Sequence, residues 1–228
     1  LNLQAQLHDL QQGLDIEQLI AQEKVTAAVY HKQALALRAS RTTAAKKLST
    51  AVTASMQTLN MTGGQFNIDL TEAAPAAHGV DAIEFKVAGH AGVALQALNK
   101  VASGGELARI SLALSVITSA ANPVPTLIFD EVDSGIGGAV AEVVGKLLAQ
   151  LGQERQVLCV THLPQVAAQG EHHWQVSKST RDHVTTSQIQ VLTAEERIEE
   201  VARMLGGVDI SATTRIHARE MLSRPSLS

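Results

Sequence analysis

Two short apolar segments separated by a single helix restrict the fold of this chain more than any other feature of its sequence. The segments are residues 126–130 and 156–161, and a glycine-rich turn followed by a helix over 138–151 lies between them. Strands that are apolar on both faces and joined by one helix are typical of a parallel β-α-β unit buried on both sides. The sequence therefore predicts an α/β fold with a parallel sheet core flanked by helices.

The beginning of the chain predicts a helical arm. It is rich in Ala, Gln, Leu and Lys, it contains no Pro, and Val52, Met56 and Leu59 are spaced by four and three residues. This spacing fits either the end of a coiled coil or an ordinary packed pair of helices. We therefore expect two domains, a helical arm over residues 1–59 and a lobe over residues 60–228.

Further strands and helices are expected on both sides of the β-α-β unit. Residues 66–70 and 83–87 alternate between apolar and polar side chains, which predicts half-buried antiparallel strands joined by a loop with Pro, Ala and Gly. Two more strands are expected over residues 173–179 and 184–192. Two helices finish the chain, and the first of them opens with a capping box, Thr193-Ala-Glu-Glu196.

Composition excludes several classes of protein. Hydrophobic residues make up 45% of the chain and charged residues 18%, so a packed core is expected. A single cysteine, Cys159, argues against a disulfide framework and for a reducing compartment. No apolar stretch reaches the ~20 residues needed to span a bilayer. The net charge of −4 gives no support for a strongly basic nucleic-acid surface.

Two carboxylates, Asp130 and Glu131, follow the first apolar strand. Ligands of parallel sheets gather beyond the carboxyl ends of the strands. One carboxylate there can hold Mg²⁺, usually through water, while its neighbour orients and deprotonates an attacking water. The alternative interpretation is a strand that ends in an ordinary polar turn.

A second candidate site is Ser103-Gly-Gly-Glu106, at the start of a helix expected to reach about residue 121. Ser103 and Glu106 fit a capping box, which is a purely structural role. The two glycines do not fit it, because each costs ~1 kcal/mol inside a helix relative to Ala. They are explained if a group must approach the backbone closely, and a phosphate at a helix N-terminus is the obvious candidate.

Two further candidates lie beside the carboxylates. His162 follows the second apolar strand, so the parallel arrangement puts it at the same sheet edge as Asp130, where it can hydrogen-bond a phosphate and sense its loss. Asp133-Ser-Gly135 directly follows Glu131 and forms either a plain glycine turn or a loop that crosses to a partner subunit.

Three motifs together carry a resemblance to a known family. They are Ser103-Gly-Gly-Glu-Leu-Ala-Arg109, Thr126-Leu-Ile-Phe-Asp-Glu-Val-Asp-Ser-Gly135 and Val160-Thr-His-Leu-Pro-Gln-Val-Ala167. In this order they resemble the ABC-type ATPase head of the structural-maintenance-of-chromosomes (SMC) class, and they are most similar to the RecN family of bacterial DNA repair proteins. The resemblance implies the C-terminal lobe of an ABC-type P-loop ATPase head, preceded by the returning arm of a coiled coil.

The resemblance also implies a role for each candidate residue. Glu131 is similar to the catalytic base, His162 to the switch histidine, and Asp130 to the ligand of Mg²⁺. The residues expected to contact ATP held by the opposite head are Ser103, Gly104, Gly105 and Glu106. Asp133 is expected to belong to the loop that crosses to that head and to take part in this contact.

The loop that grips the phosphates, G-x-x-x-x-G-K-[ST], does not occur in this sequence. In the family that this chain resembles, the loop lies in an N-terminal lobe, before the coiled coil. The expected partners are therefore that lobe, a second head across ATP, and DNA by resemblance alone, with no membrane. We expect a bacterial, cytoplasmic, nucleoid-associated ATPase of double-strand break repair and recombination, whose isolated C-terminal half is inactive.

Two alternatives share the same motifs. One is the nucleotide-binding subunit of an ABC transporter. The arm-like helices of residues 1–59 argue against this alternative. The other is a half-head that only dimerises and catalyses nothing, which the missing phosphate-gripping loop favours for the chain by itself.

Overall fold

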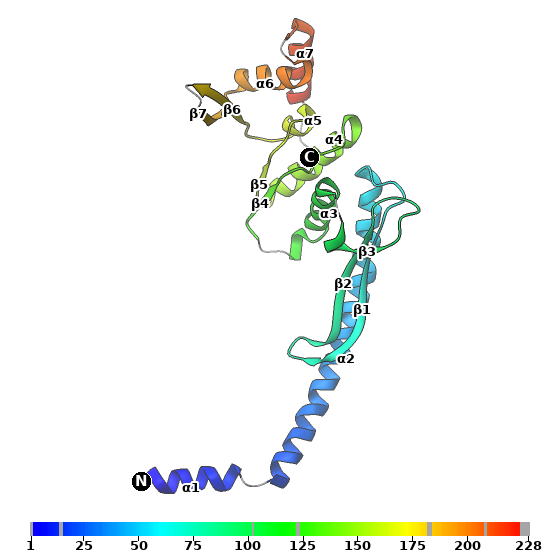
Figure 1. Cartoon of the computed structure of the whole chain (residues 1–228), viewed down its shortest axis with the longest axis vertical. Coiled ribbons are helices and arrows are strands. Elements are labelled where there is room, and N and C mark those ends of the chain that lie inside the picture. Colours follow the sequence, from blue (N-terminus) through cyan, green and yellow to red (C-terminus); the bar gives the residue numbers. More distant parts are fainter. Residues whose placement is uncertain are drawn as a thin grey trace. The chain divides into compact units, whose positions relative to one another are not determined.

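The computed structural model describes residues 2–13, 16–101, 103–121, 124–181, 184–207 and 209–223. The chain divides into two compact units, one made of Leu1–Lys47 with Ile68–Phe85 and the other of Leu48–Asn67 with Lys86–Ser228. Figure 1 labels the elements of both units along the chain. No helix in the described ranges is both long and apolar enough to cross a membrane.

The first unit combines helices with most of a β-hairpin. Helix α1 spans Asn2–Gly13 and α2 spans Ile16–Thr58, with the end of α2 belonging to the second unit. Strands β1 (Gln65–Ala76) and β2 (Gly79–Ala88) are neighbours in a sheet. Both predicted strands are present but longer than expected, because the Pro- and Ala-containing segment continues β1 up to a two-residue connection. The domain boundary after residue 59 stays a prediction.

Polar contacts hold this hairpin on α2. The Tyr30 hydroxyl lies 2.9 Å from the carbonyl oxygen of Ala76 and 3.1 Å from that of Gly79, and it accepts a bond from the Ala76 N–H at 3.0 Å. Arg38 Nε and Arg41 Nη1 each lie 3.3 Å from a carboxylate oxygen of Asp81, whose side chain is fully buried. A buried carboxylate is costly unless it is paired, so these two arginines explain why an acid is tolerated under the hairpin.

The second unit contains the predicted parallel β-α-β unit. Strand β4 (Thr126–Phe129) pairs in parallel with β5 (Gln156–Cys159), and α4 (Gly138–Gly152) connects them. Helix α3 (Gly104–Ile117) packs against α4 in one core. The buried residues of this core are Leu59, Leu112, Ala113, Phe129, Val132, Ala141, Val144, Leu148, Leu151 and Val166. The parallel sheet is therefore confirmed.

The prediction that these strands are buried on both faces is wrong for this chain. Phe129 is 5% exposed, but Ile128, which points to the other face of β4, is 72% exposed. The reason is that α3 and α4 contribute to the core on the Phe129 face, while no described element buries Ile128.

The remaining elements of the second unit are short strands and helices. Strand β3 (Gln96–Ala97) pairs antiparallel with β2, and α5 (Pro164–Ala167) follows β5. Neither was predicted, because two- and four-residue elements have no periodicity to read. The short 3₁₀ helices η1 and η2 span Leu98–Lys100 and Ser119–Ala121.

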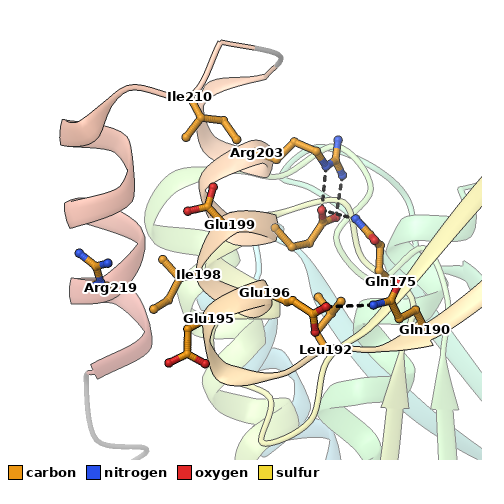
Figure 2. A pocket seen from close by; sticks show the side chains of 11 residues that line it. Gln175, Gln190, Leu192, Glu195, Glu196, Ile198, Glu199, Arg203, Ile210 and Arg219 are labelled. Atoms are coloured by element: carbon orange, nitrogen blue, oxygen red, sulfur yellow. Dashed lines mark hydrogen bonds and ion pairs between the residues drawn. The ribbon is translucent and has the colours of Figure 1, made fainter.

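The end of the chain forms a hairpin and two helices, as predicted. Strand β6 (Trp174–Arg181) pairs antiparallel with β7 (Val184–Val191), and α6 (Ala194–Gly206) and α7 (Ala212–Ser223) follow. Figure 2 shows the polar contacts between the hairpin and α6. There Gln175 donates to Glu200 at 2.6 Å, and Gln190 donates to Glu196 at 3.1 Å.

The capping box at the start of α6 is confirmed. The Glu196 N–H donates to the Thr193 hydroxyl at 3.4 Å, and the Thr193 N–H donates back to the Glu196 carboxylate at 2.8 Å. The bond from the Thr193 N–H to the carboxylate lowers the pKa of Glu196, and a bond from the Thr193 hydroxyl acts in the same direction.

Replacement of the capping residue tests this contribution to stability. We expect Thr193→Ala to lower the free energy of unfolding by about 1 kcal/mol, because the first turn of α6 loses its side-chain acceptor. Thr193→Ser keeps a hydroxyl and is the matched control. Chemical denaturation of both variants measures the effect, and equal stabilities for Ala and Ser would contradict the assigned cap.

Candidate functional site

The carboxyl ends of β4 and β5 meet at one edge of the parallel sheet. Phe129 lies opposite Cys159 in the register, and the Val160 N–H donates to the Phe129 carbonyl at 3.0 Å. Asp130 and Glu131 directly follow β4. The parallel pairing therefore brings the two carboxylates to the same edge as the Thr161–His162 segment, as the sequence predicted.

The two carboxylates are exposed and lie on an unusual stretch of backbone. Asp130 Oδ1 accepts a hydrogen bond from the Glu131 N–H at 2.9 Å. Glu131 has a φ of 58°, in the left-handed region that residues other than glycine seldom adopt. The Ser134 N–H donates to the Glu131 carbonyl at 3.0 Å, which closes a tight turn over residues 131–134. A strained residue held by a closed turn is typical of functional sites.

Asp133 joins this turn to the segment after β5. Its side chain is 4% exposed. Its Oδ2 accepts hydrogen bonds from the Thr161 hydroxyl and from the His162 N–H, the latter at 3.1 Å, and lies 3.3 Å from His162 Nδ1. The imidazole of His162 is 71% exposed. Asp133 is thus turned inward, while His162 faces solvent.

The Ser103-Gly-Gly-Glu106 segment starts α3, and its capping interpretation is confirmed for Ser103. The Glu106 N–H donates to the Ser103 hydroxyl at 3.3 Å. The Glu106 carboxylate lies 3.6 Å from Nε2 of His90, a residue that the sequence did not single out. Ser103 is exposed, so its hydroxyl remains accessible from solvent.

The two glycines of this segment lie against the turn that carries the acids. A side-chain carbon at Gly104 would collide with the Glu131 carboxylate, and one at Gly105 would come within 3.1 Å of both the carbonyl oxygen and the Cβ of Ser134. The sequence correctly predicted that a group approaches this backbone closely. That group is the protein's own turn, whereas contact with a phosphate remains a prediction.

Arg109 was missed as a site residue. It is 5% exposed, and its Nη1 donates to the Ser134 carbonyl at 2.8 Å. Burial lowers the pKa of its guanidinium, and the negative charge of Glu106 partly opposes that shift. The signal that could have revealed it is a single cation inside the apolar stretch of residues 107–121. Charged residues are almost never buried without a partner.

Arg197 of α6 was also missed, and it anchors the segment beyond His162. Its Nη atoms donate to the carbonyls of Ala167 and Ala168 at 3.2 Å and of Glu171 at 3.1 Å, as well as to that of Gly170. Burial lowers the pKa of this guanidinium. No periodicity in the sequence reveals such contacts, since they join a helix to the carbonyls of a loop.

The acids fit a Mg²⁺–nucleotide complex better than a bare metal ion. Among the described residues no group of three or more His, Cys, Asp or Glu side chains could hold a metal ion. Mg²⁺ is commonly held by one or two carboxylates together with water and substrate phosphates. Asp130 is an exposed carboxylate that meets this requirement.

The pKa of the Cys159 thiol depends on the charges at this edge of the sheet. Burial raises its pKa to about 12, and the negative charges of Asp133 and Asp130 act in the same direction. It is the only cysteine of the chain, so its reactivity is a clean probe of the surrounding charge.

Comparison with known proteins identifies relatives over most of the chain. No protein-family model matches it. It is 49% identical over 189 residues to the DNA repair protein RecN of Xylella fastidiosa (strain 9a5c), 46% over 208 residues to that of Haemophilus influenzae, and 36% over 200 residues to that of Bacillus subtilis (strain 168). These alignments cover 82%, 90% and 81% of this chain but 34%, 37% and 35% of the relatives. The chain thus spans about a third of the relatives' length.

Solved structures with a similar fold are SMC head domains. The Smc head domain with a coiled coil and joint from Pyrococcus yayanosii is similar with a TM-score of 0.55 at 22% identity, covering 86% of this chain and 35% of that chain. The Smc head domain from Pyrococcus furiosus with an extended coiled coil, bound to the C-terminal domain of ScpA, has a TM-score of 0.52 at 21% identity, covering 88% and 47%. At these identities the likeness concerns the fold alone, and it confirms the predicted α/β head lobe.

Alkylation of Cys159 tests the electrostatics of the site. With a pKa of about 12 instead of 9.0, the thiol stays protonated at pH 8, so we expect it to react with iodoacetamide about a thousandfold more slowly than a free thiol. Asp133→Asn removes a negative charge and should lower the pKa of the Cys159 thiol. The rate of alkylation at pH 8 should rise by about tenfold for each unit by which this pKa falls.

Asp209→Asn removes an exposed carboxylate near the C-terminal helices and is the matched control, with no change in rate expected. Equal rates for the Asp133 and Asp209 variants would show that Asp133 does not influence the thiol.

Proposed function

The chain belongs to the RecN family of bacterial DNA repair proteins, and from that premise we propose that it supplies the acid-bearing lobe of an ATPase head that acts in double-strand break repair and recombination. The observation that carries the proposal is the gathering of three separate motifs around one turn. The turn of residues 131–134 carries Glu131 and directly follows Asp130. Gly104 and Gly105 lie against it, and the Thr161 hydroxyl and the His162 N–H donate to its Asp133.

Asp130 and Glu131 have different tasks in this proposal. Bound Mg²⁺-ATP supplies the phosphoryl group to be transferred, with the ion neutralising its charge. Asp130 holds the ion, largely through water, with the carboxylate oxygen that Glu131 N–H does not occupy. Glu131 orients a water molecule and takes its proton, for which an exposed carboxylate at a strand end is suited.

His162 and the start of α3 face the phosphates in this proposal. His162 is exposed, and Asp133 contacts both its backbone N–H and its Nδ1, which leaves Nε2 of the imidazole to donate to a phosphate oxygen. The first turn of α3 offers backbone N–H groups and the positive end of the helix dipole. Ser103, Gly104, Gly105 and Glu106 would approach the γ-phosphate of ATP held by a second head, and Asp133 would form part of the loop between the heads.

A further lobe is the first partner that we propose. Ile128 and Val160 are 72% and 63% exposed at the sheet that carries the site. Large apolar side chains at the core sheet of an α/β domain are normally covered. The RecN relatives are about three times as long as the matched segment, and we assign to the remainder of such a polypeptide the G-x-x-x-x-G-K-[ST] loop and the surface that covers these residues.

Exposed leucines on the arm support a helical partner as well. Leu3, Leu7 and Leu10 are 82%, 57% and 64% exposed and are spaced by four and three residues along α1. Such a stripe is the pattern of a coiled-coil seam. In this proposal the partner is the outgoing arm of the same coiled coil, DNA is the substrate of the assembled protein, and the assembly works in the bacterial cytoplasm at the nucleoid.

A dimerising half-head without catalysis is the second candidate. The absence of the phosphate-gripping loop from this sequence favours it for the chain alone. The transporter alternative has no such support, since the relatives named above are DNA repair proteins.

Nucleotide binding and turnover test the proposal. We expect no tight binding of Mg²⁺-ATP by the chain alone in calorimetry, and binding with hydrolysis once it is mixed with the remaining segment of a RecN relative that carries the loop. In that mixture Glu131→Gln should lower the hydrolysis rate by about 10²–10⁴-fold, because the group that takes the proton is lost, while binding of ATP persists.

Glu220→Gln, on α7, is the control and should hydrolyse ATP like the unchanged chain. Turnover by the isolated chain that Glu131→Gln abolishes would refute the need for a partner lobe. A mixture of folded segments that binds ATP but does not hydrolyse it would favour the dimerising half-head.

A further inference from the structure

We propose that Arg109 is a positioning residue that links the first turn of α3 to the turn of residues 131–134. Through this link, a ligand bound at one of the two would change the position of the other. The inference rests on the proposed function for its catalytic consequence. The physical tie itself belongs to this chain and is testable without nucleotide.

Stability alone does not account for an arginine at this position. Arg109 is 5% exposed, and its Nε is a buried polar atom without a hydrogen-bond partner among the described residues. Burying a guanidinium with an unsatisfied N–H is unfavourable, and an apolar residue of similar volume is often as stable or more so. A cation kept here at such a cost has a task other than filling the core.

The hydrogen bond that the guanidinium makes with another described residue identifies that task. Arg109 Nη1 donates to the Ser134 carbonyl at 2.8 Å, and the Ser134 N–H donates to the Glu131 carbonyl at 3.0 Å. The peptide groups of Ser134 therefore link Arg109 to the left-handed residue Glu131. A shift of Arg109 along α3 must move or break this chain of bonds.

Close packing makes the link stiff. Gly105 lies so near that an added Cβ would be 3.1 Å from Arg109 Nη1 and equally near the Ser134 carbonyl oxygen. Gly104, one residue earlier, lies against the Glu131 carboxylate. The start of α3 and the turn thus touch through backbone and short polar contacts, which leaves little room for one to move independently.

The turn passes the constraint on to the second strand. Asp133, which lies between Glu131 and Ser134, accepts hydrogen bonds from Thr161 and from the His162 N–H. A displacement of Gly104 and Gly105 would reach Glu131 and His162 through the same turn of residues 131–134. In the proposed head, this makes the position of the acids depend on whether a phosphate occupies the start of α3.

Amide hydrogen exchange of the full 228-residue chain tests the tie directly. In Arg109→Met we expect the amides of residues 133–136 to exchange about five- to tenfold faster, which is the effect of one lost hydrogen bond on local opening. The amides at the centre of α4, such as that of Val144, should be unchanged. The melting temperature should not fall, because Met fills the volume without an unsatisfied N–H.

Two variants make the result specific. Arg109→Lys keeps a donor for the Ser134 carbonyl and should restore most of the protection. Ile110→Val trims a neighbouring buried side chain of α3 that is 1% exposed, and it should leave the turn unaffected. Faster exchange in α4 to the same extent as in the turn, or an unchanged turn in Arg109→Met, would overturn the proposal.

The catalytic consequence is measured in the mixture with the loop-carrying segment. Arg109→Met should lower kcat about tenfold or more while KM for ATP stays within about twofold, since the acids and not the nucleotide grip are displaced. Arg109→Lys should recover part of kcat. If the turn exchanges faster in Arg109→Met but kcat is unchanged, the catalytic role of Arg109 is overturned. If the unchanged chain does not hydrolyse ATP in the mixture, that result counts against the proposed function. Hydrogen exchange then decides by itself whether Arg109 holds the turn.

Discussion

The carboxylate of Asp133 holds together the two strand ends on which the site depends. Taken alone, this nearly buried charge is unfavourable, and the Thr161 hydroxyl and the His162 N–H compensate it. Those bonds connect the turn after β4 with the segment after β5, beyond the last pair of the parallel ladder, Phe129 and Cys159. Without them the acids and the histidine would sit on two independent loops, and their spacing would not be defined.

Hydrophobic patterning and parallel geometry predicted most of this arrangement from the sequence. The apolar segments 126–130 and 156–161, with one helix between them, required a parallel pair, and a parallel pair brings Asp130, Glu131 and His162 to one edge. Capping chemistry at Ser103 and Thr193 marked the starts of two helices correctly. These signals are local or periodic, so a single sequence carries them.

The features that the sequence did not reveal depend on contacts between distant residues. Arg109 reaches a carbonyl 25 positions away, and Tyr30 bonds to backbone 46 positions away. Neither bond leaves a repeating pattern, because backbone carbonyls are the same at every position. The exposure of Ile128 was missed for a different reason, since apolar residues predict burial without telling whether the covering surface lies in the same segment.

The start of α3 can serve the protein and a ligand together. A hydroxyl has one proton to donate and two lone pairs that accept. Ser103 uses a lone pair for the Glu106 N–H, and at 3.3 Å this bond is longer than the usual 2.9–3.0 Å. The proton of the hydroxyl is not used by this bond, and Gly104 and Gly105 accommodate the acid-bearing turn. If this segment binds an anion as proposed, then capping, close packing and anion binding would use different atoms of the same four residues, and serine and glycine would each have a reason to occur there.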